Sequence, residues 1–217
     1  MDAVVTSQVQ LFFSQYKLRS YSKGQILLLN GDTTNYVYYL VKGKVKQYDV
    51  TYRGDEMILN TFKPPAFFPM SLAINKVENP YIYEAETGVD IRQAPAGEVV
   101  RFLKSHPDVL YDLLSRVYYG ADCLLGRITQ LMSGSAQSRL IYELILEARR
   151  FGIYDENKKG CALKITEKDL GAHAGLSRET ISREIHKLKT DGMITMRNKS
   201  LYISSMRELE LKLGQVI

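Results

Sequence analysis

Short runs of apolar, aromatic and β-branched residues alternate with polar residues from Tyr21 to about Gln93. Glycines stand near the ends of these runs, at Gly24, Gly31, Gly43, Gly54 and Gly88. Alternation of this kind is typical of half-buried strands, and glycine supplies the backbone freedom that tight turns need. The pattern therefore predicts an antiparallel β-sandwich or β-roll in the N-terminal half.

The alternation ends after Pro95, where the period of the apolar residues changes. From about Pro107 onward, apolar residues recur at spacings that alternate between four and three, namely Leu110, Leu114, Val117, Ala121, Leu124, Ile128 and Leu131. A heptad seam lets one helix pack along another, most simply the same helix of a second copy across a two-fold axis. The pattern predicts a long dimerisation helix, with packing along its own domain as the alternative.

Small residues interrupt that helix at 133–135. A new amphipathic pattern begins at Ser138, followed by an extended piece near 161–165, two short helices and a β-hairpin that turns near 198–199. These changes divide the sequence into a β-rich domain (1–106), a long helix with a hinge (107–133) and a C-terminal domain of short helices and a hairpin (134–217).

Composition adds a weak preference for an acidic partner. The 217 residues carry a net charge of +5, and the length suits two modest domains. Residues 1–133 hold 14 Lys and Arg against 13 Asp and Glu, whereas residues 134–217 hold 15 against 11. The basic excess lies mostly in the C-terminal part, where we expect contacts with a nucleic acid.

The sequence gives little support for secretion, membrane insertion or metal binding. The N-terminal segment carries Asp2 and lacks the sustained apolar run of a signal peptide or membrane span, so a cytoplasmic protein with no membrane partner is expected. The two cysteines, Cys123 and Cys161, are far apart and predict neither a disulfide nor a zinc site. Idle or buried thiols are the simpler interpretation.

One C-terminal stretch predicts two short helices joined by a tight turn. Thr166 is suited to cap the first helix, with Asp169 at the capping-box position. Gly175 allows the turn, and Ser177 is suited to cap the second helix. Together with the hairpin that follows, this arrangement favours a winged helix-turn-helix that binds DNA.

The second of these helices has an apolar and a polar arc. At about 100° per residue, Ile181, Ile185 and Leu188 fall within an arc of about 60° that should face the core. The polar side holds Arg178, Glu179, Ser182, Arg183, His186 and Lys187. An Arg fork donates twice to guanine O6 and N7, and a Glu accepts from cytosine N4. A merely solvated face is the alternative, but the caps, turn and hairpin favour base recognition.

These residues resemble the CRP/FNR family of bacterial transcription regulators, and the resemblance covers nearly the whole chain. The segment Arg178–Arg183 (RETISR) is similar to the family's R-E-T-x-x-R and E-x-x-S-R forms, which read a G·C pair in a TGA-containing half-site. Residues 21–59 resemble its β-roll, and the heptad helix resembles its dimerisation helix. The resemblance implies an α+β fold with an antiparallel β-roll of the double-stranded β-helix or jelly-roll type, a long dimerisation helix and a C-terminal winged helix-turn-helix.

The resemblance also implies a homodimer on double-stranded DNA, with inverted half-sites about 34 Å apart, and RNA polymerase as a further partner. By matching position, Arg183 should read guanine and Glu179 the paired cytosine, while Arg178 and Ser182 should contact neighbouring bases. Contacts with DNA phosphates, which set register without specificity, are expected from Thr166, Lys168, Ser177, Thr180 and Lys199.

The sensory half departs from the branch of the family that binds cyclic nucleotides. That branch carries a Gly-Glu-Leu element and then Arg-Ser/Thr-Ala, whose Glu and Arg hold the ribose and the cyclic phosphate. The matching stretches here are 68–71 (FPMS) and 79–81 (NPY), which contain neither the acid nor the base. A buried phosphate without a cation is costly, so cyclic AMP is not expected as a cofactor.

Other cofactors are also unexpected. An iron-sulfur cluster, as in another branch, needs several cysteines, and two distant ones cannot ligate it. Haem needs an axial ligand, and His106 is the only histidine outside the DNA-binding half. Because a lone histidine is usually structural, we expect neither haem nor another metal.

The predicted roll is rich in aromatic residues, which in strands most often form core or cross-strand pairs. The alternative is an apolar pocket for a small organic effector. The candidate effector region consists of Phe67, Phe68, Met70, Ser71, Tyr81 and Tyr83. Binding of DNA without any ligand is an equally open alternative. An enzyme is the weakest alternative, because the sequence has no phosphate loop, GxSxG or HExxH motif, and no catalytic residue is assigned.

Overall fold

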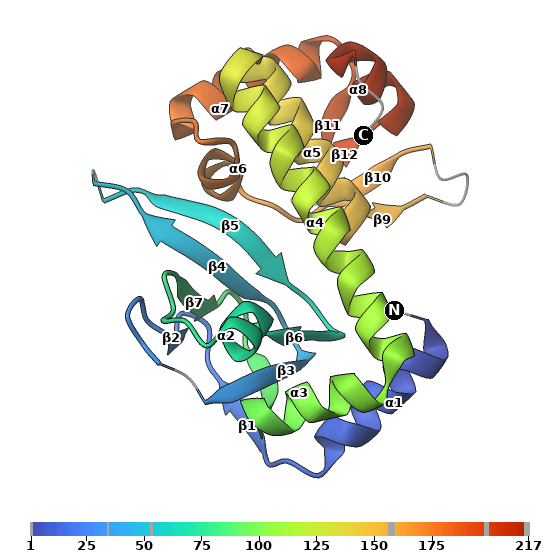
Figure 1. Ribbon diagram of the computed structural model, residues 1–217. Coiled ribbons are helices and arrows are strands. Elements are labelled where there is room, and N and C mark those ends of the chain that lie inside the picture. Colours follow the sequence, from blue (N-terminus) through green and yellow to red (C-terminus); the bar gives the residue numbers. More distant parts are fainter. Residues whose placement is uncertain (1, 34, 53, 156–158, 198–199, 215–217) are drawn as a thin grey trace. The chain divides into compact units, whose positions relative to one another are not determined.

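The computed structural model describes residues 2–33, 35–52, 54–155, 159–197 and 200–214 (Figure 1). The chain forms two compact units, Met1–Tyr118 and Tyr119–Ile217, whose boundary falls within the long helix α4 (Pro107–Ser133). Strands dominate the first unit and helices the second, so the predicted α+β class is confirmed. Among the described helices, none is long and apolar enough to cross a bilayer.

The N-terminal unit is built from eight described strands, three short helices and the first part of α4. Its elements are α1 (Ala3–Ser14), β1 (Leu18–Tyr21), β2 (Ile26–Leu28), β3 (Tyr36–Lys42), β4 (Val45–Val50), β5 (Glu56–Phe62), β6 (Ala66–Phe68), α2 (Met70–Asn75), β7 (Ile82–Ala85), β8 (Val89–Pro95) and α3 (Ala96–Ser105).

Two four-stranded antiparallel sheets enclose the core of the roll, with strand orders β1-β8-β3-β6 and β2-β7-β4-β5. The central part of β3 is buried on both faces. Tyr38 and Leu40 belong to the core between the sheets, whereas Val37 and Tyr39 pack with helices on the other side. This follows from the alternation of side chains along a strand. The predicted antiparallel roll is confirmed.

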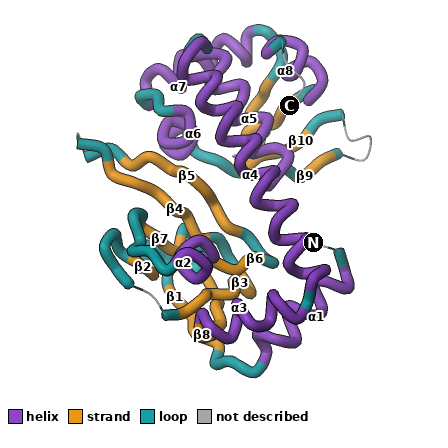
Figure 2. The backbone as a smooth tube through the Cα atoms, in the orientation of Figure 1, coloured by secondary structure: helices purple, strands orange, loops and turns teal. Residues whose placement is uncertain are grey.

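Helices α1 and α3 contact β8 beside the first sheet (Figure 2), and the sequence patterns do not predict them. Val5, Val9 and Phe13 on α1 are buried together with Val99 and Leu103 on α3. The spacing of four along α1 is helical, but three apolar positions are too few to separate a short helix from a loop. The hydrophobic contacts are made with a distant part of the chain.

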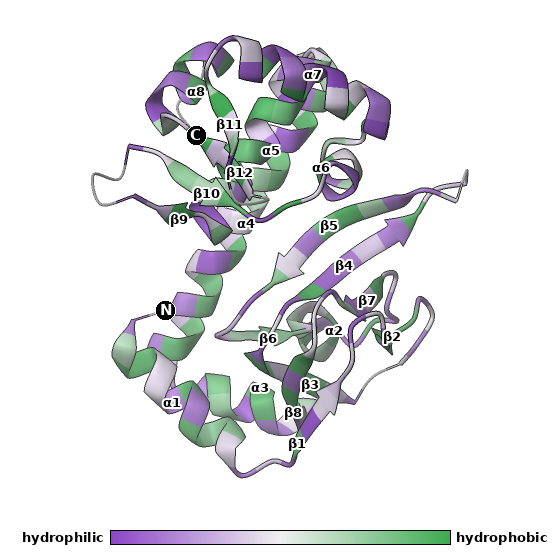
Figure 3. Cartoon of the chain, turned by 180° about the vertical axis from the view of Figure 1, so that it is seen from behind, coloured by the Kyte–Doolittle hydropathy of each residue, from purple (hydrophilic) through white to green (hydrophobic). Residues whose placement is uncertain are grey.

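The C-terminal unit contains the last part of α4 and a helical core with a small sheet. Its elements are α5 (Ala136–Phe151), β9 (Ile153–Tyr154), β10 (Cys161–Leu163), α6 (Glu167–Ala174), α7 (Arg178–Thr190), β11 (Ile194–Arg197), β12 (Ser200–Ile203) and α8 (Met206–Leu213). The sheet order is β11-β12-β10-β9. Figure 3 shows the hydrophobic residues of α5 in the middle of this unit, with many hydrophilic residues on α7 and α8 around them. The sequence patterns miss β9 and α8.

Candidate DNA-binding surface

The first helix of the helix-turn-helix, α6, begins at a capping box. The Thr166 hydroxyl oxygen accepts from the Asp169 backbone N–H at 3.1 Å, and the Asp169 carboxylate accepts from the Thr166 hydroxyl at 2.6 Å. The predicted cap is confirmed. Because the hydroxyl proton of Thr166 is used within the cap, a phosphate contact from this side chain would compete with Asp169.

The turn between α6 and α7 depends on two glycines. Gly175 ends α6 with a φ of 62°, in the left-handed region that glycine adopts at little cost, as its predicted place in the turn requires. At Gly171 an added Cβ would lie 2.7 Å from the Leu176 carbonyl oxygen, so only glycine fits this close approach. Sequence reasoning missed Gly171, because its restriction comes from a contact that closes only when the turn forms.

Helix α7 is capped by Ser177, whose hydroxyl oxygen accepts from the Thr180 backbone N–H at 3.2 Å, as predicted. The predicted apolar arc is also confirmed, since Ile181, Ile185 and Leu188 are all buried. They join a core formed with α5, α6 and the small sheet. This burial fixes the rotation of α7 about its own axis and leaves the opposite face exposed.

All four predicted base-reading side chains, Arg178, Glu179, Ser182 and Arg183, are exposed. Their positions fall within an arc of about 140° on α7, in which Glu179, Ser182 and Arg183 lie away from the buried residues and Arg178 lies at the exposed N-terminal end. They occupy the first two turns of the helix, next to an N-terminus whose free N–H groups attract anions. The structure therefore brings these residues together on one face, and their roles at individual bases stay a prediction.

The residues predicted to contact phosphates differ in exposure and in hydrogen bonding. Lys168 is exposed on α6, while the hydroxyls of Ser177 and Thr180 share a hydrogen bond of 3.0 Å at the start of α7. Lys199 lies outside the described residues. Sequence reasoning did not single out Arg197, which lies at the end of β11. Its guanidinium carbon lies 3.7 Å from the centroid of the Tyr202 ring on β12. The Arg197 guanidinium, which stacks on the Tyr202 ring, therefore lies next in the chain to the predicted hairpin turn.

The hairpin that follows α7 pairs β11 with β12, from Ile194 opposite Ile203 to Arg197 opposite Ser200. These strands are the predicted ones, and the turn at 198–199 lies outside the described residues. The strand β12 also pairs with β10, so the hairpin is part of the small sheet. The sheet attaches the hairpin to the core that holds α7.

Within the C-terminal unit, a buried ion pair ties the last part of α4 to α5. The Arg127 guanidinium donates from Nε and Nη2 to the two carboxylate oxygens of Glu143, each at 2.7 Å. Their side chains are 13% and 3% exposed. Burial alone would lower the pKa of Arg127, but the hydrogen bonds and charge of Glu143 outweigh burial and raise it.

Two further contacts bring α4 close to α5. The Tyr142 hydroxyl donates to the Cys123 carbonyl oxygen at 3.0 Å, and Gly126 leaves room for the tyrosine where a Cβ would clash with it. Nearby, Glu147 and His173 are buried, with Oε1 and Nε2 3.9 Å apart. Buried ionisable groups thus run from α4 through α5 to α6, inside the unit that carries α7.

Hydrogen bonds connect the two helices on either side of the segment predicted as a hinge. The Gly134 N–H donates to the Gln130 carbonyl oxygen at 2.8 Å, and Arg139 donates to the carbonyl oxygens of Gln130 and Leu131 at 3.3 and 2.9 Å. A Cβ at Gly134 would lie 2.6 Å from the Gln130 carbonyl oxygen. Any reorientation at 133–135 must break these contacts.

The predicted seam of α4 is exposed along its whole length, at Leu110, Leu114, Val117, Ala121, Leu124, Ile128 and Leu131. Six of these are large hydrophobic side chains, with exposures from 41% to 58%. An uninterrupted row of exposed apolar side chains is costly in water and typical of a surface that pairs with another helix. Packing along its own domain therefore does not account for this face.

The predicted effector region is split between two cores. Phe67 and Phe68 are adjacent on β6, so Phe67 packs with α1 and β3, whereas Phe68 enters the roll. The Phe68 ring stacks on Phe62 at 4.7 Å and on Tyr83 at 5.5 Å between ring centroids. Met70 and Tyr81 are half-buried, and Ser71 is exposed. The six residues do not form one lining, and aromatic rings fill the roll beside β6.

A cation on β4 is already neutralised. The Lys46 ammonium lies 2.8 Å from a carboxylate oxygen of Glu56 and 3.4 Å from one of Glu84. The Tyr48 hydroxyl donates to Glu84 at 3.0 Å, and burial together with this hydrogen bond raises the tyrosine pKa to about 12. This cluster does not offer a free positive charge to an anionic ligand.

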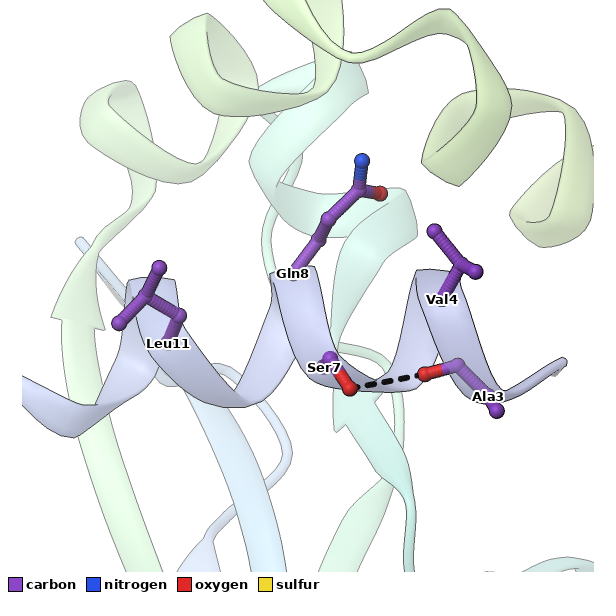
Figure 4. A pocket seen from close by; sticks show the side chains of 5 residues that line it. All are labelled: Ala3, Val4, Ser7, Gln8 and Leu11. Carbon is purple, nitrogen blue, oxygen red and sulfur yellow. Dashed lines mark hydrogen bonds between the residues drawn. The ribbon is translucent and has the colours of Figure 1, made fainter.

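A shallow hollow of about 420 Å³ lies over α1 (Figure 4). Its lining residues are Ala3, Val4, Ser7, Gln8 and Leu11, which all belong to this one helix. The Ser7 hydroxyl donates to the Ala3 carbonyl oxygen at 2.9 Å and is therefore used within the helix. The hollow has the character of a surface depression rather than an enclosed site.

Metal-binding groups are not assembled in the part of the chain that is described, where no three His, Cys, Asp or Glu side chains are grouped to hold an ion. His106 Nδ1 lies 2.9 Å from the Phe102 carbonyl oxygen and 3.0 Å from the Ser105 hydroxyl, at the end of α3. These contacts give the histidine a local structural role. Cys123 is half-buried and Cys161 is buried, and both are free thiols.

Two family models match the chain, one to each part. The cyclic nucleotide-binding domain matches residues 18–106, and the Crp-like helix-turn-helix domain matches residues 138–211. The second match contains the capped helices and the face of α7 described above. The first contains both sheets of the roll.

Curated relatives and a solved structure match the chain along most of its length. The HTH-type transcriptional regulator ArcR of Staphylococcus haemolyticus is 26% identical over 91% of this chain and 86% of its own length. The cAMP-activated global transcriptional regulator CRP of Salmonella typhimurium is 22% identical over 92% and 95%. A CooA mutant from Carboxydothermus hydrogenoformans has the same fold, with a TM-score of 0.78, 18% identity and coverage of 93% and 89%.

Proposed function

This chain belongs to the CRP/FNR family of DNA-binding transcription regulators, and we propose that it acts as a homodimer on a palindromic operator with TGA-type half-sites. Its cyclic nucleotide-binding domain precedes a Crp-like helix-turn-helix domain. The family consists of transcription regulators rather than enzymes. The observation that carries the proposal is the capped helix α7, whose first two turns present Arg178, Glu179, Ser182 and Arg183 together on an exposed face.

On this proposal α7 enters the major groove. Arg183 donates to guanine O6 and N7, and Glu179 accepts from the paired cytosine, while Arg178 and Ser182 contact neighbouring bases. The exposed Lys168 and the hydroxyls of Thr166, Ser177 and Thr180 hold the phosphates on either side, which for Thr166 means giving up its bond to Asp169. Lys199 is assigned to a phosphate because the sequence pattern predicts the hairpin turn near 198–199.

Dimerisation supplies the second half-site. The exposed seam of α4 supports pairing with the same helix of a second copy, which would set two copies of α7 about 34 Å apart. The last turns of α4 are bonded to α5 through Arg127 and Glu143, so the part of the seam from Ala121 to Leu131 lies in the same compact unit as α7. We assign residues 1–106 to the sensory domain, 107–133 to the dimerisation helix and 134–217 to DNA binding.

The role of the roll has two candidate forms. One is gating by a small effector other than cyclic AMP, since Phe68–Ser71 and Asn79–Tyr81 offer neither the carboxylate nor the guanidinium for a cyclic nucleotide. Asn79 is itself used in the fold, donating from Nδ2 to the Leu29 carbonyl oxygen at 2.6 Å. The other form is ligand-independent DNA binding. The stacked rings of Phe62, Phe68 and Tyr83 favour this second form, because they occupy the core between the two sheets.

Selection from random duplex DNA tests the proposal. The purified protein is incubated with the library at a fixed salt concentration, because phosphate contacts make affinity strongly dependent on salt. Enrichment of a palindrome with TGA-type half-sites is the expected result, and enrichment without added metabolites supports the ligand-independent form. Enrichment only after addition of a metabolite extract supports the gated form. Failure to enrich any motif under both conditions contradicts sequence-specific binding.

A further inference from the structure

Glu184 is a carboxylate on the buried side of the recognition helix α7. It is 4% exposed, and it flanks the apolar arc of Ile181, Ile185 and Leu188. A carboxylate at such a position must be compensated by a cation or by hydrogen bonds, because burial of an unpaired charge is costly. The chemistry around Glu184 therefore indicates why a charged residue occupies this site.

Two cations of the exposed face converge on one oxygen of Glu184. The Lys187 ammonium lies 2.8 Å from Oε1, and the Arg183 Nε lies 3.6 Å from the same atom. The side chains of Arg183 and Lys187 are 66% and 54% exposed, whereas that of Glu184 is 5% exposed. One oxygen of a buried carboxylate thus lies near two cations of the exposed helix face.

Contact through Nε has a specific consequence for Arg183. Guanidinium carries its donors on three nitrogens, and the two terminal ones form the fork that matches guanine O6 and N7. The ion pair with Glu184 involves the inner nitrogen, at 3.6 Å, so it leaves the terminal fork unused.

We propose that Glu184 is a positioning residue for base recognition, which holds Arg183 by its inner nitrogen and keeps the terminal fork available for guanine. This inference rests on the proposed base-reading role of Arg183. Glu184 does not touch DNA on this account. It raises the affinity for the correct base pair relative to a wrong one, because a preorganised side chain loses less freedom on binding.

The negative charge of Glu184 has an opposite effect on general DNA affinity. It holds Lys187 and lowers the positive potential that phosphates meet at this face. Loss of the charge should therefore weaken discrimination while leaving general affinity equal or higher. Structural damage to α7 would lower both, so the two roles give different results.

The test compares Glu184→Gln with a matched control, Glu208→Gln, which removes the same charge from an exposed position on α8. Each protein is titrated at one salt concentration with the selected operator, with an operator changed at the G·C pair that Arg183 reads, and with a scrambled duplex. We expect Glu184→Gln to reduce discrimination at that base pair about fivefold to tenfold, within the range for one base contact. Its affinity for the scrambled duplex should not fall. Glu208→Gln should keep the wild-type discrimination.

A second variant separates a loss of base discrimination from a folding defect. Glu184→Met replaces the carboxylate with an apolar side chain of similar length, which buried sites often accept without loss of stability. It should lose discrimination to the same extent as Glu184→Gln. In an Arg183→Ala background neither substitution should change discrimination further, because Glu184 acts through Arg183.

Unchanged discrimination in both Glu184 variants would overturn the proposal, and so would an equal loss in Glu208→Gln or a further loss in the Arg183→Ala background. Failure of the proposed function has a separate signature. In that case Arg183→Ala itself shows no change in discrimination at any base pair of the operator.

Discussion

Cys161 and Cys123 show how burial decides the chemistry of single side chains. Cys161 is fully buried in the core beside α5, and burial raises its thiol pKa to about 11. Cys123 is half-buried on α4. The sequence separates the two residues but gives no sign of this difference, because both lie in amphipathic stretches.

At pH 8 we expect Cys161 to resist alkylation by iodoacetamide in the folded protein, because the thiolate is the reactive form and burial suppresses it. Folding raises the pKa from its ordinary value of 9.0 to about 11, so the contribution of this thiol to stability is complete below pH 9.0 and is lost as the pH rises towards 11. Mass spectrometry of the native protein and of the protein in urea measures the reaction. Rapid modification of Cys161 in the native protein would contradict its burial.

At the scale of elements, α4 and α5 are held by the ion pair of Arg127 and Glu143. Replacing one member of a buried pair leaves an uncompensated charge, which costs about 3–5 kcal/mol, whereas replacing both with apolar residues is often neutral. We expect Arg127→Met to lower the free energy of unfolding by about that amount and the double variant Arg127→Met, Glu143→Leu to recover most of it. Urea unfolding measures both. A double variant no more stable than Arg127→Met would contradict the pairing.

The elements that the sequence predicts are those with strong local signals. The heptad of α4, the caps at Thr166 and Ser177 and the turn at Gly175 all follow from neighbouring residues. Helices α1, α3 and α8 are short, and their hydrophobic faces match only surfaces formed elsewhere in the chain.

The candidate site was predictable to the same degree. The exposed arc of α7 follows from helical periodicity, so Arg178, Glu179, Ser182 and Arg183 could be chosen from sequence alone. Glu184 could not, because a glutamate within a polar helix is ordinarily solvated and its burial depends on packing. The effector region was grouped by chain proximity, which ignores that adjacent strand residues such as Phe67 and Phe68 face opposite sides.

At the scale of the whole molecule, the exposed seam of α4 supports a dimer. Leu124 in the seam and Leu125 beside it are 48% and 61% exposed, so they offer a matched pair of positions. Leu124→Glu should shift the protein to a monomer in sedimentation velocity and strongly weaken operator binding, because like charges would face each other across the seam. Leu125→Glu should leave both properties unchanged. Dissociation by Leu125→Glu alone would place the interface on another face of α4.

The central claim is that the exposed face of α7 reads bases. Its most direct test is the affinity of the wild type and of Arg183→Ala for a matched operator and a scrambled duplex, titrated at one salt concentration. Removal of Arg183 should lower the ratio of the two affinities about tenfold or more, since a good base contact is worth about 1–3 kcal/mol in each half-site. Equal weakening on both duplexes would show that Arg183 contacts only the phosphates and would contradict the account.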